Sequence, residues 1–190
     1  MAELHSDLGE PGNEESETLL SGAAAAAAGG FTAVGVVSNG HPFADNKTGV
    51  EFIANKSDQS PIHLIPIGTA TKGRDGEELS EMFDMHEHGS PMFGDYKHGI
   101  TNANVLKLAL LYSRSFGRIM VHPEDENLVA GGKMNEGETS TFVGLKGTPA
   151  LSEYLRISRD IKLLEYTEGA LHIPSISTKE GIEAVRKAKA

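Results

Sequence analysis

The strongest constraint on the fold is an alternation, along 190 residues, of short β-branched runs and amphipathic helical patterns. Glycine, proline and asparagine separate the two kinds of segment, which is typical of repeated βα units around a parallel sheet. The pattern therefore predicts an α/β fold with helices outside one parallel sheet. Strands are expected at residues 1–4, 31–37, 62–67, 91–93, 118–121 and 171–173.

Helices are expected between these strands, where apolar residues recur at helical spacing beside capping residues. Asn13 is the expected cap of the first helix, because three glutamates close behind it would favour the positive end of the helix dipole. The Gly29-Gly30 pair is expected to end that helix. A further helix is expected at residues 77–87, and the later helices are expected to open at Asn102, Thr148 and Ser177.

A single domain over residues 1–190 is expected, because a chain of this length with 38% hydrophobic residues can bury one core. A complete eight-stranded (β/α) barrel typically needs about 250 residues and seldom fewer than about 200. We therefore expect an incomplete (β/α)8 barrel of the TIM type, made of roughly strands 1 to 6 with their helices.

Composition narrows the chemistry and the partners. The chain has no Cys, so disulfides, thiolate zinc sites and cysteine nucleophiles are excluded, and any metal must be held by His and carboxylates. A formal net charge of −10 without a basic cluster would repel nucleic acid. The alanine run at residues 23–28 is too short to span a bilayer. We expect a cytoplasmic protein with neither nucleic acid nor membrane as a partner.

Polar residues follow the ends of the expected strands, which is where the active site of a βα barrel is built. Imidazole and carboxylate groups in that position can hold a divalent ion that activates water. The same residues can equally be solvated or can cap loops. The residues at these positions are His5, Asp7, Ser38, Asn39, His41, Thr71, Lys72, Asp95, Lys97, His122, Glu124, Asp125, Ser175 and Ser177.

A series of short motifs, in order along the chain, resembles those of the dihydroorotases. Residues 5–12 (His-Ser-Asp-Leu-Gly-Glu-Pro-Gly) stand where the family has His-x-His-x-Arg-x-Pro-Gly, and residues 29–32 match its Gly-Gly-x-Thr. Later motifs include His-Pro-Glu-Asp at 122–125 and Met-Asn-Glu-Gly at 134–137. The other matching segments lie at residues 38–42, 71–73, 144–149 and 172–178.

The resemblance implies a barrel of the amidohydrolase type with a zinc site. It also implies reversible ring closure of carbamoyl aspartate to dihydroorotate in pyrimidine synthesis. On this basis the metal ligands would be His5, Asp7, Asp95 and His122, and Asn39 would bind the substrate. Aspartate transcarbamoylase, or a second copy of the chain, would be the protein partner.

Departures from the family motifs predict that activity is impaired in this chain alone. Asp7 stands in place of a ligand His, Gly9 in place of an Arg that would clamp a substrate carboxylate, and Ser175 in place of another ligand His. The Asp-Asp-Gly of the family corresponds to residues 95–97, here Asp-Tyr-Lys. The general-base Asp would lie beyond Ala190, so no residue is assigned to proton transfer. The alternative function is a non-catalytic dihydroorotase-like scaffold or an inactive fragment.

Each candidate also has a structural interpretation. His5 and His122 can be polar residues at a barrel mouth without binding a metal. Asn39 followed by Gly is ordinary turn chemistry. His86 and His88 fall on an expected helix, where a solvated face is the simpler explanation.

Overall fold

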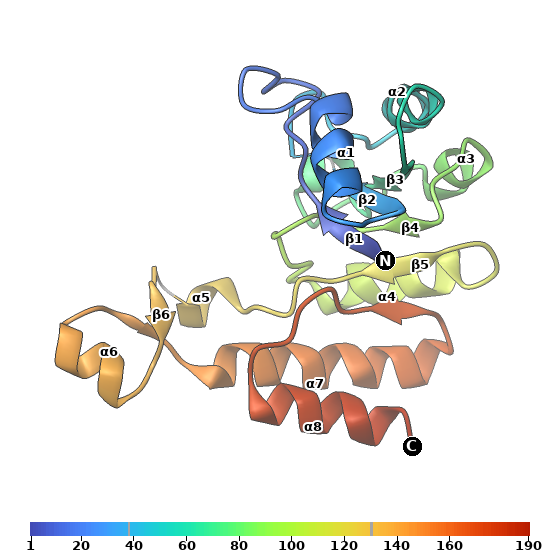
Figure 1. The fold of residues 1–190 in the computed structure, drawn as a ribbon. Coiled ribbons are helices and arrows are strands. Elements are labelled where there is room, and N and C mark those ends of the chain that lie inside the picture. The colour runs from blue at the N-terminus through green and yellow to red at the C-terminus, as the bar shows by residue number, and fades with distance from the viewer. Residues whose placement is uncertain (38, 130) are drawn as a thin grey trace.

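The computed structural model describes residues 1–37, 39–129 and 131–190, which form a curved parallel sheet with helices on its outer side (Figure 1). Hydrogen bonding joins the strands in the order β1-β2-β3-β4-β5-β8, and every neighbouring pair is parallel. This confirms the expected sheet of sequential βα units and its incomplete TIM-type barrel architecture. The strands are β1 (Ala2–Ser6), β2 (Ala33–Val37), β3 (His63–Gly68), β4 (Met92–Phe93), β5 (Arg118–Met120) and β8 (Leu171–His172).

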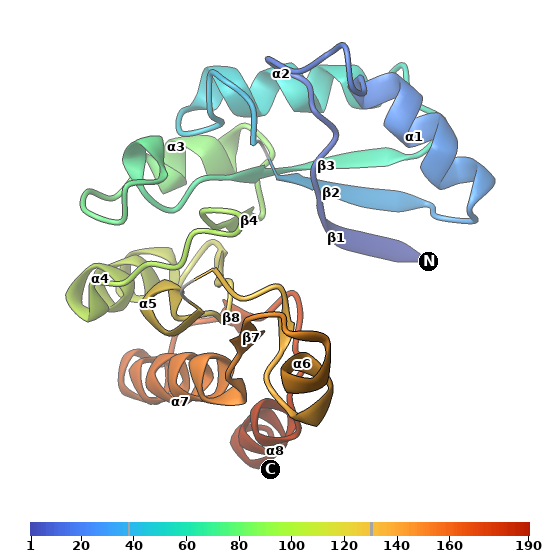
Figure 2. The same ribbon diagram turned by 90° about the vertical axis from the view of Figure 1, so that its left-hand side faces the viewer.

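The outer layer consists of helices that connect successive strands. Figure 2 shows α1, α2 and α3 along the outer side of the first strands, while α4 and α7 continue this layer and α8 packs on α7. None of the helices in the described segments is both long and apolar enough to cross a membrane. The bounds are α1 (Leu19–Ala28), α2 (Lys47–Ser57), η1 (Lys72–Arg74), α3 (Met82–Glu87), α4 (Ala103–Ser113), α5 (Glu126–Val129), α7 (Ala150–Thr167) and α8 (Lys179–Ala188).

Alternation along the strands divides the apolar side chains between the two faces of the sheet. One set packs under the helices and forms the main core, with Phe93 and Ile119 fully buried in it. The opposite set forms a smaller cluster on the inner face, against which Leu4, Ile65 and Tyr96 pack. This inner cluster is the floor beneath the carboxyl ends of the strands. Its buried members are Val37, Ile67, Met92 and Met120.

The first helix begins later than the sequence predicts. Thr18, not Asn13, is its N-cap, and the Thr18 hydroxyl accepts a hydrogen bond from the backbone N–H of Ser21. The Glu10 carboxylate also accepts from the Leu19 N–H at 2.8 Å. The backbone carbonyl of Asn13 accepts hydrogen bonds inside a turn, so the glutamates that follow it lie before the helix. Local turn bonds therefore override the favourable capping pattern at Asn13.

Other helix boundaries also differ from the expected ones. Helix α3 begins at Met82 because the segment before it pairs back on the preceding loop, through a bridge between Thr71 and Leu79. Pro149 precedes α7, and Thr178 rather than Ser177 caps α8. Helix α2, which sequence analysis missed, is capped by the Asn46 side chain.

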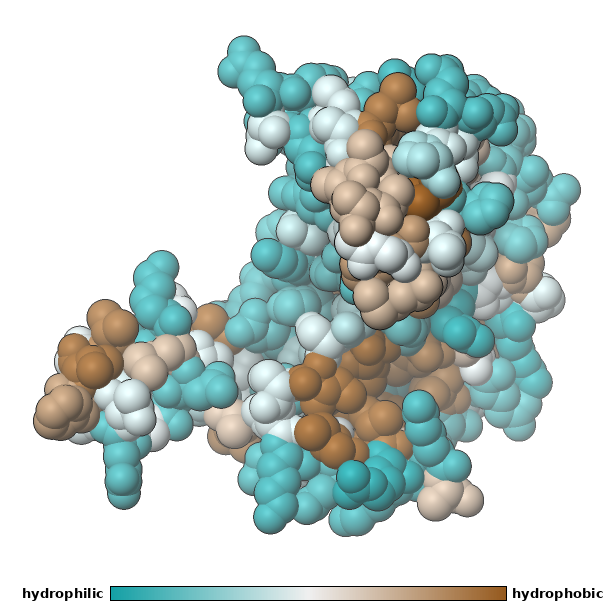
Figure 3. All heavy atoms as spheres, viewed as in Figure 1, coloured by the Kyte–Doolittle hydropathy of each residue, from teal (hydrophilic) through white to brown (hydrophobic). Residues whose placement is uncertain are grey.

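A small arm projects from the barrel between α5 and α7 (Figure 1). It contains β6 (Met134–Asn135), α6 (Glu138–Val143) and β7 (Gly147–Thr148), and the two strands pair in parallel. Sequence analysis did not predict these two strands, because neither Met-Asn nor Gly-Thr forms an apolar run. Figure 3 shows apolar side chains at the tip of this arm, where Phe142 is 90% exposed.

Candidate functional site

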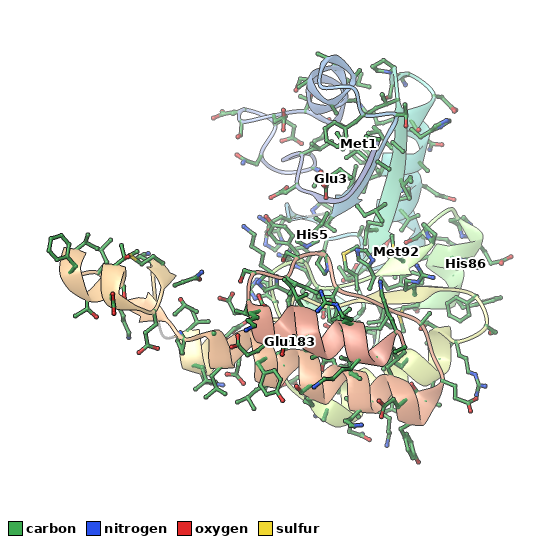
Figure 4. All side chains as sticks on the ribbon, turned by 60° about the horizontal axis from the view of Figure 1, so that its bottom comes forward. Met1, Glu3, His5, His86, Met92 and Glu183 are labelled. Atoms are coloured by element: carbon green, nitrogen blue, oxygen red, sulfur yellow. The ribbon has the colours of Figure 1, made fainter. Side chains whose placement is uncertain are left out.

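Two imidazoles meet where β1 and β5 end. Figure 4 shows His5 near the centre of the molecule, with Met1 and Glu3 further out along β1 and His86 far away on the outer side. Burial lowers the pKa of His5, and the nearby imidazole of His122 lowers it further. Both rings keep a buried nitrogen, Nε2 of His5 and Nδ1 of His122, with no hydrogen-bond partner in the described part of the chain. A neutral imidazole with such a nitrogen is suited to accept a proton or a metal ion.

Asp7 and Asn39 are hydrogen-bonded to each other at the same end of the sheet. We call this end, made of the carboxyl ends of the strands and the loops that follow them, the mouth. Asn39 Nδ2 donates to Asp7 Oδ2 at 3.0 Å, and the backbone N–H of Gly9 donates to Asp7 Oδ1 at 3.1 Å. The Oδ1 atom of Asn39 accepts a hydrogen bond from Arg74 at 3.1 Å. The loops after β1, β2 and β3 are therefore linked through one carboxylate, one amide and one guanidinium. Ser38, which opens the same motif as Asn39, lies outside the described residues.

Asp95 lies two residues after β4 and holds the loop after β3. Its side chain is 2% exposed, and Oδ1 accepts the backbone N–H groups of Ala70 and Thr71 at 2.9 and 3.0 Å. The Thr71 hydroxyl donates to Oδ2 at 2.7 Å. Burial raises the pKa of Asp95, although these hydrogen bonds oppose that effect. Both carboxylate oxygens are thus engaged in fixing the loop after β3.

Tyr96 covers His5, a contact that sequence analysis did not predict. The two rings stack with their centroids 5.3 Å apart and an interplanar angle of 25°. Tyr96 has a φ of 59°, a left-handed conformation that is uncommon for a bulky residue. One feature of the sequence could have indicated this contact, because Tyr96 stands where the family motif has an acidic residue.

A second part of the mouth lies between the loops after β5 and β8. A cavity of about 360 Å³ is lined by His122, Glu124, Asn135 and Ser175, among others. Nε2 of His122 lies 3.1 Å from Glu124 Oε2. Ser175, where the family motif has a ligand imidazole, is exposed and lines the same cavity as His122.

Glu153 of α7 ties this second part to α8, and sequence analysis missed it. Its carboxylate accepts the backbone N–H groups of Ser177 and Thr178, both at 2.8 Å, and both hydroxyls as well. Burial acts to raise the pKa of Glu153, but these hydrogen bonds outweigh it and lower the pKa. The carboxylate of Glu153, on α7, therefore supplies the negative charge that stabilises the amino end of α8.

Comparison with known families gives the lineage. A family model described as "Dihydro-orotase-like" matches residues 1–181. The chain belongs to the dihydroorotase-like family.

Relatives within this family match the whole chain but extend well beyond it. A protein named dihydroorotase from Pelotomaculum thermopropionicum is 42% identical over 191 residues, which cover 100% of this chain and 45% of the relative. Another from Caldicellulosiruptor saccharolyticus is 43% identical over 98% of this chain and 44% of its own length. The chain thus spans less than half the length of these dihydroorotases.

Solved structures of similar fold include hydantoinases. The L-hydantoinase (dihydropyrimidinase) of Arthrobacter aurescens superposes with a TM-score of 0.76 at 17% identity, covering 99% of this chain and 44% of that one. A D-hydantoinase superposes with a TM-score of 0.70, also at 17% identity, covering 99% of this chain and 43% of that one. At such identities the likeness concerns the fold alone, and it agrees with the incomplete (β/α) barrel of this chain.

The residues at the mouth do not by themselves fit a complete zinc site. Zinc in a catalytic site takes three protein ligands. Across residues 1–37, 39–129 and 131–190, no group of three His, Asp or Glu side chains is placed to hold a metal ion. His5 and His122 have suitable nitrogens, whereas Asp95 is engaged by the loop after β3 and Asp7 by Asn39.

Proposed function

We propose that this chain forms part of a dihydroorotase-like amidohydrolase that acts on a cyclic amide, interconverting carbamoyl aspartate and dihydroorotate in pyrimidine synthesis. The observation that carries the proposal is the mouth of the parallel sheet, where two imidazoles with buried, unpartnered nitrogens lie in a chain of this family. Strand ends are where βα barrels bind substrate. A cytoplasmic location belongs to the same proposal, because it follows from the family alone.

The proposed roles follow from this geometry. His5 and His122 would hold zinc through the buried nitrogens, and Asp7, which is hydrogen-bonded to Asn39, would join them as the carboxylate ligand. Asp95 would act indirectly, by fixing the loop after β3. Asn39 is exposed at the mouth and would bind the substrate through its amide. With two imidazoles as ligands, the affinity for zinc should be low.

A non-catalytic dihydroorotase-like scaffold is the second candidate, favoured by the two residues after β4. Asp95 is fully hydrogen-bonded to a loop, and Tyr96 covers His5 with an aromatic ring. Both features stabilise the mouth without presenting a third metal ligand. A scaffold of this kind would act by self-association or by binding aspartate transcarbamoylase.

Three measurements on the purified 190-residue chain test these proposals. We expect calorimetry to detect binding of dihydroorotate and carbamoyl aspartate, metal analysis to find zinc well below one per chain, and dihydroorotate hydrolysis to stay below detection. If neither ligand binds, the dihydroorotase-like function is wrong for this chain. Stoichiometric zinc with chelator-sensitive turnover would instead refute the impaired state and the scaffold.

A further inference from the structure

Arg74 is held in an unusual backbone conformation at the mouth. Gly73 and Arg74 have φ values of 56° and 60°, so two consecutive residues are left-handed. Glycine adopts this region freely, but for arginine it costs free energy, and such residues cluster at functional sites. The backbone is fixed from both sides, because Gly73 N–H donates to Asp45 at 3.2 Å and Arg74 N–H donates to the carbonyl of Thr71 at 3.2 Å.

The guanidinium of Arg74 is positioned by two contacts with the loop after β2. It lies over the Phe43 ring, with its central carbon 4.0 Å from the ring centroid. One of its terminal nitrogens donates to Asn39 Oδ1 at 3.1 Å. Burial lowers the pKa of Arg74, while Asp95 and Asp7 act to raise it. The result is a half-buried cation whose plane is set in advance, next to an exposed amide.

The loop after β1 cannot supply a guanidinium of its own. Gly9 has a φ of 72°, and a Cβ added there would lie 2.8 Å from the carbonyl oxygen of Glu17 and 3.0 Å from that of Asn13. These neighbours are backbone atoms, so they cannot move aside as a flexible side chain would. An arginine at position 9 is incompatible with this loop, and a carboxylate bound at the mouth needs another cation.

The lysines on the loops after β3 and β4 are less suited to this role. Lys72 is exposed and paired with Glu78 at 3.1 Å. Lys97 is exposed, with its ammonium 5.3 Å from the centre of the Tyr96 ring. A guanidinium presents a planar fork that matches a carboxylate, whereas an ammonium is a point charge.

We propose that Arg74, together with Asn39, binds the carboxylate of the substrate, and so replaces from the β3 loop the arginine that the family motif carries at position 9. The proposal rests on the proposed function, because it takes dihydroorotate or carbamoyl aspartate as the ligand. It makes Arg74 a specificity-determining residue, selective for cyclic amides that carry a carboxylate over those that do not.

A pair of ligands separates this role from a structural one. Dihydroorotate and dihydrouracil share the cyclic amide, but dihydrouracil lacks the carboxylate. Arg74→Asn removes the guanidinium while placing a residue that tolerates positive φ, and Arg74→Lys keeps the charge without the fork. We expect calorimetry to show dihydroorotate affinity falling by about 10- to 100-fold in Arg74→Asn, and by less in Arg74→Lys. Dihydrouracil binding should be unchanged in both.

The control is Arg114→Asn, which removes an exposed arginine that pairs with Glu168 and lies between α4 and the amino end of β5, away from the carboxyl ends of the strands. It should bind both ligands as the parent chain does. Equal weakening of both ligands by Arg74→Asn would show a structural role and overturn the proposal, as would unchanged dihydroorotate affinity. In those cases the dihydroorotase-like function would stand. Absence of dihydroorotate binding to the parent chain would overturn both.

Discussion

At the scale of single residues, the mouth combines features that favour binding with features that block it. The buried nitrogens of His5 and His122 have no hydrogen-bond partner among the described residues, which is costly unless a ligand or water satisfies them. Tyr96 stacks on His5 and restricts access to it. The affinity of this mouth for a metal ion should therefore depend strongly on the side chain of Tyr96.

Replacing Tyr96 with Asp should raise zinc affinity. The change removes the ring from His5 and places a carboxylate beside it, and Asp tolerates the left-handed backbone at this position better than Tyr does. We expect a gain of about tenfold or more in equilibrium dialysis, of the size reported for partners of metal ligands. Tyr166→Asp, at a residue 75% exposed on α7, is the matched control and should show no gain. Equal zinc affinity in the two variants would mean that His5 does not face an ion site.

The pH dependence of stability should reflect His172 on β8. Burial lowers the pKa of His172, and Arg118 lowers it further. The unfolded chain therefore binds a proton more readily than the folded one, so stability is lost as the pH falls below the ordinary value of 6.5. Urea unfolding at pH 7.5 and at pH 5.5, about one unit on either side of 6.5, measures this loss. The free energy of unfolding should fall less between the two pH values in His172→Gln than in the parent chain. His63→Gln, at an exposed position on β3, should keep the parent's loss, and an equal loss in all three chains would contradict this account.

Sequence reasoning placed several candidate residues at the carboxyl ends of strands, where the structure also has them, and missed other contacts for a definable reason. His5 lies near the end of β1, and Asp7, Asn39 and His122 come one or two residues after β1, β2 and β5. These positions could be expected because the strands follow the alternating βα pattern. The engagement of Asp95 could not, because its partners lie 24 and 25 residues earlier in a loop without a repeating pattern. The role of these residues as metal and substrate ligands remains a prediction.

At the scale of elements, helix α7 is fixed to the barrel by a buried charged cluster. Asp160 is fully buried and lies 2.7 Å from an Arg159 nitrogen and 3.9 Å from Arg156 Nε. Arg159 also donates to the backbone carbonyls of Ile100 and Thr101, just before α4. Burial raises the pKa of Asp160, although both arginines oppose that effect. The cluster therefore joins α7 to the start of α4 by hydrogen bonds from a charged side chain, in addition to apolar contacts.

Asp160→Ala should destabilise the fold strongly, because it leaves two arginines without their buried counter-charge. Breaking such a pair from one side typically costs about 3–5 kcal/mol, and we expect the free energy of unfolding to fall by about 3 kcal/mol. Chemical denaturation measures this directly. Glu165→Ala removes an exposed partner of Lys162 on the same helix and should cost less than about 1 kcal/mol. A similar fall in the free energy of unfolding in the two variants would show that Asp160 stabilises the fold no more than an exposed carboxylate does.

The elements predicted most closely are those whose own residues show a clear pattern. Strands β2 and β3 and helix α4 were expected close to their observed positions, because each is long enough to show its period. Helix α1 begins five residues later than a cap at Asn13 would place it, since Glu10 and Thr18 bind its first N–H groups. These contacts come from a loop whose shape no local pattern indicates.

At the scale of the whole molecule, the described sheet is an open arc that ends at β1 on one side and β8 on the other. Strands β2 to β5 have a neighbour on both sides, and most of the buried core lies under them. The inner apolar cluster of Val37, Ile67, Met92 and Met120 lies on the concave face of this one sheet, and no second sheet among the described residues packs against it. Stability should therefore decrease from the middle of the arc towards its two edges.

That arc has a consequence for the order in which the backbone opens. Amide hydrogens on β3, between two partners, should exchange with solvent more slowly than those on β1 and β8, where opening breaks one ladder instead of two. Hydrogen–deuterium exchange measured by mass spectrometry on peptides from each strand gives the ranking. Uniform exchange rates across the six strands would contradict it and indicate a single cooperative opening. With the expected ranking, His5 on β1 would be released to solvent while the floor of the mouth is still intact.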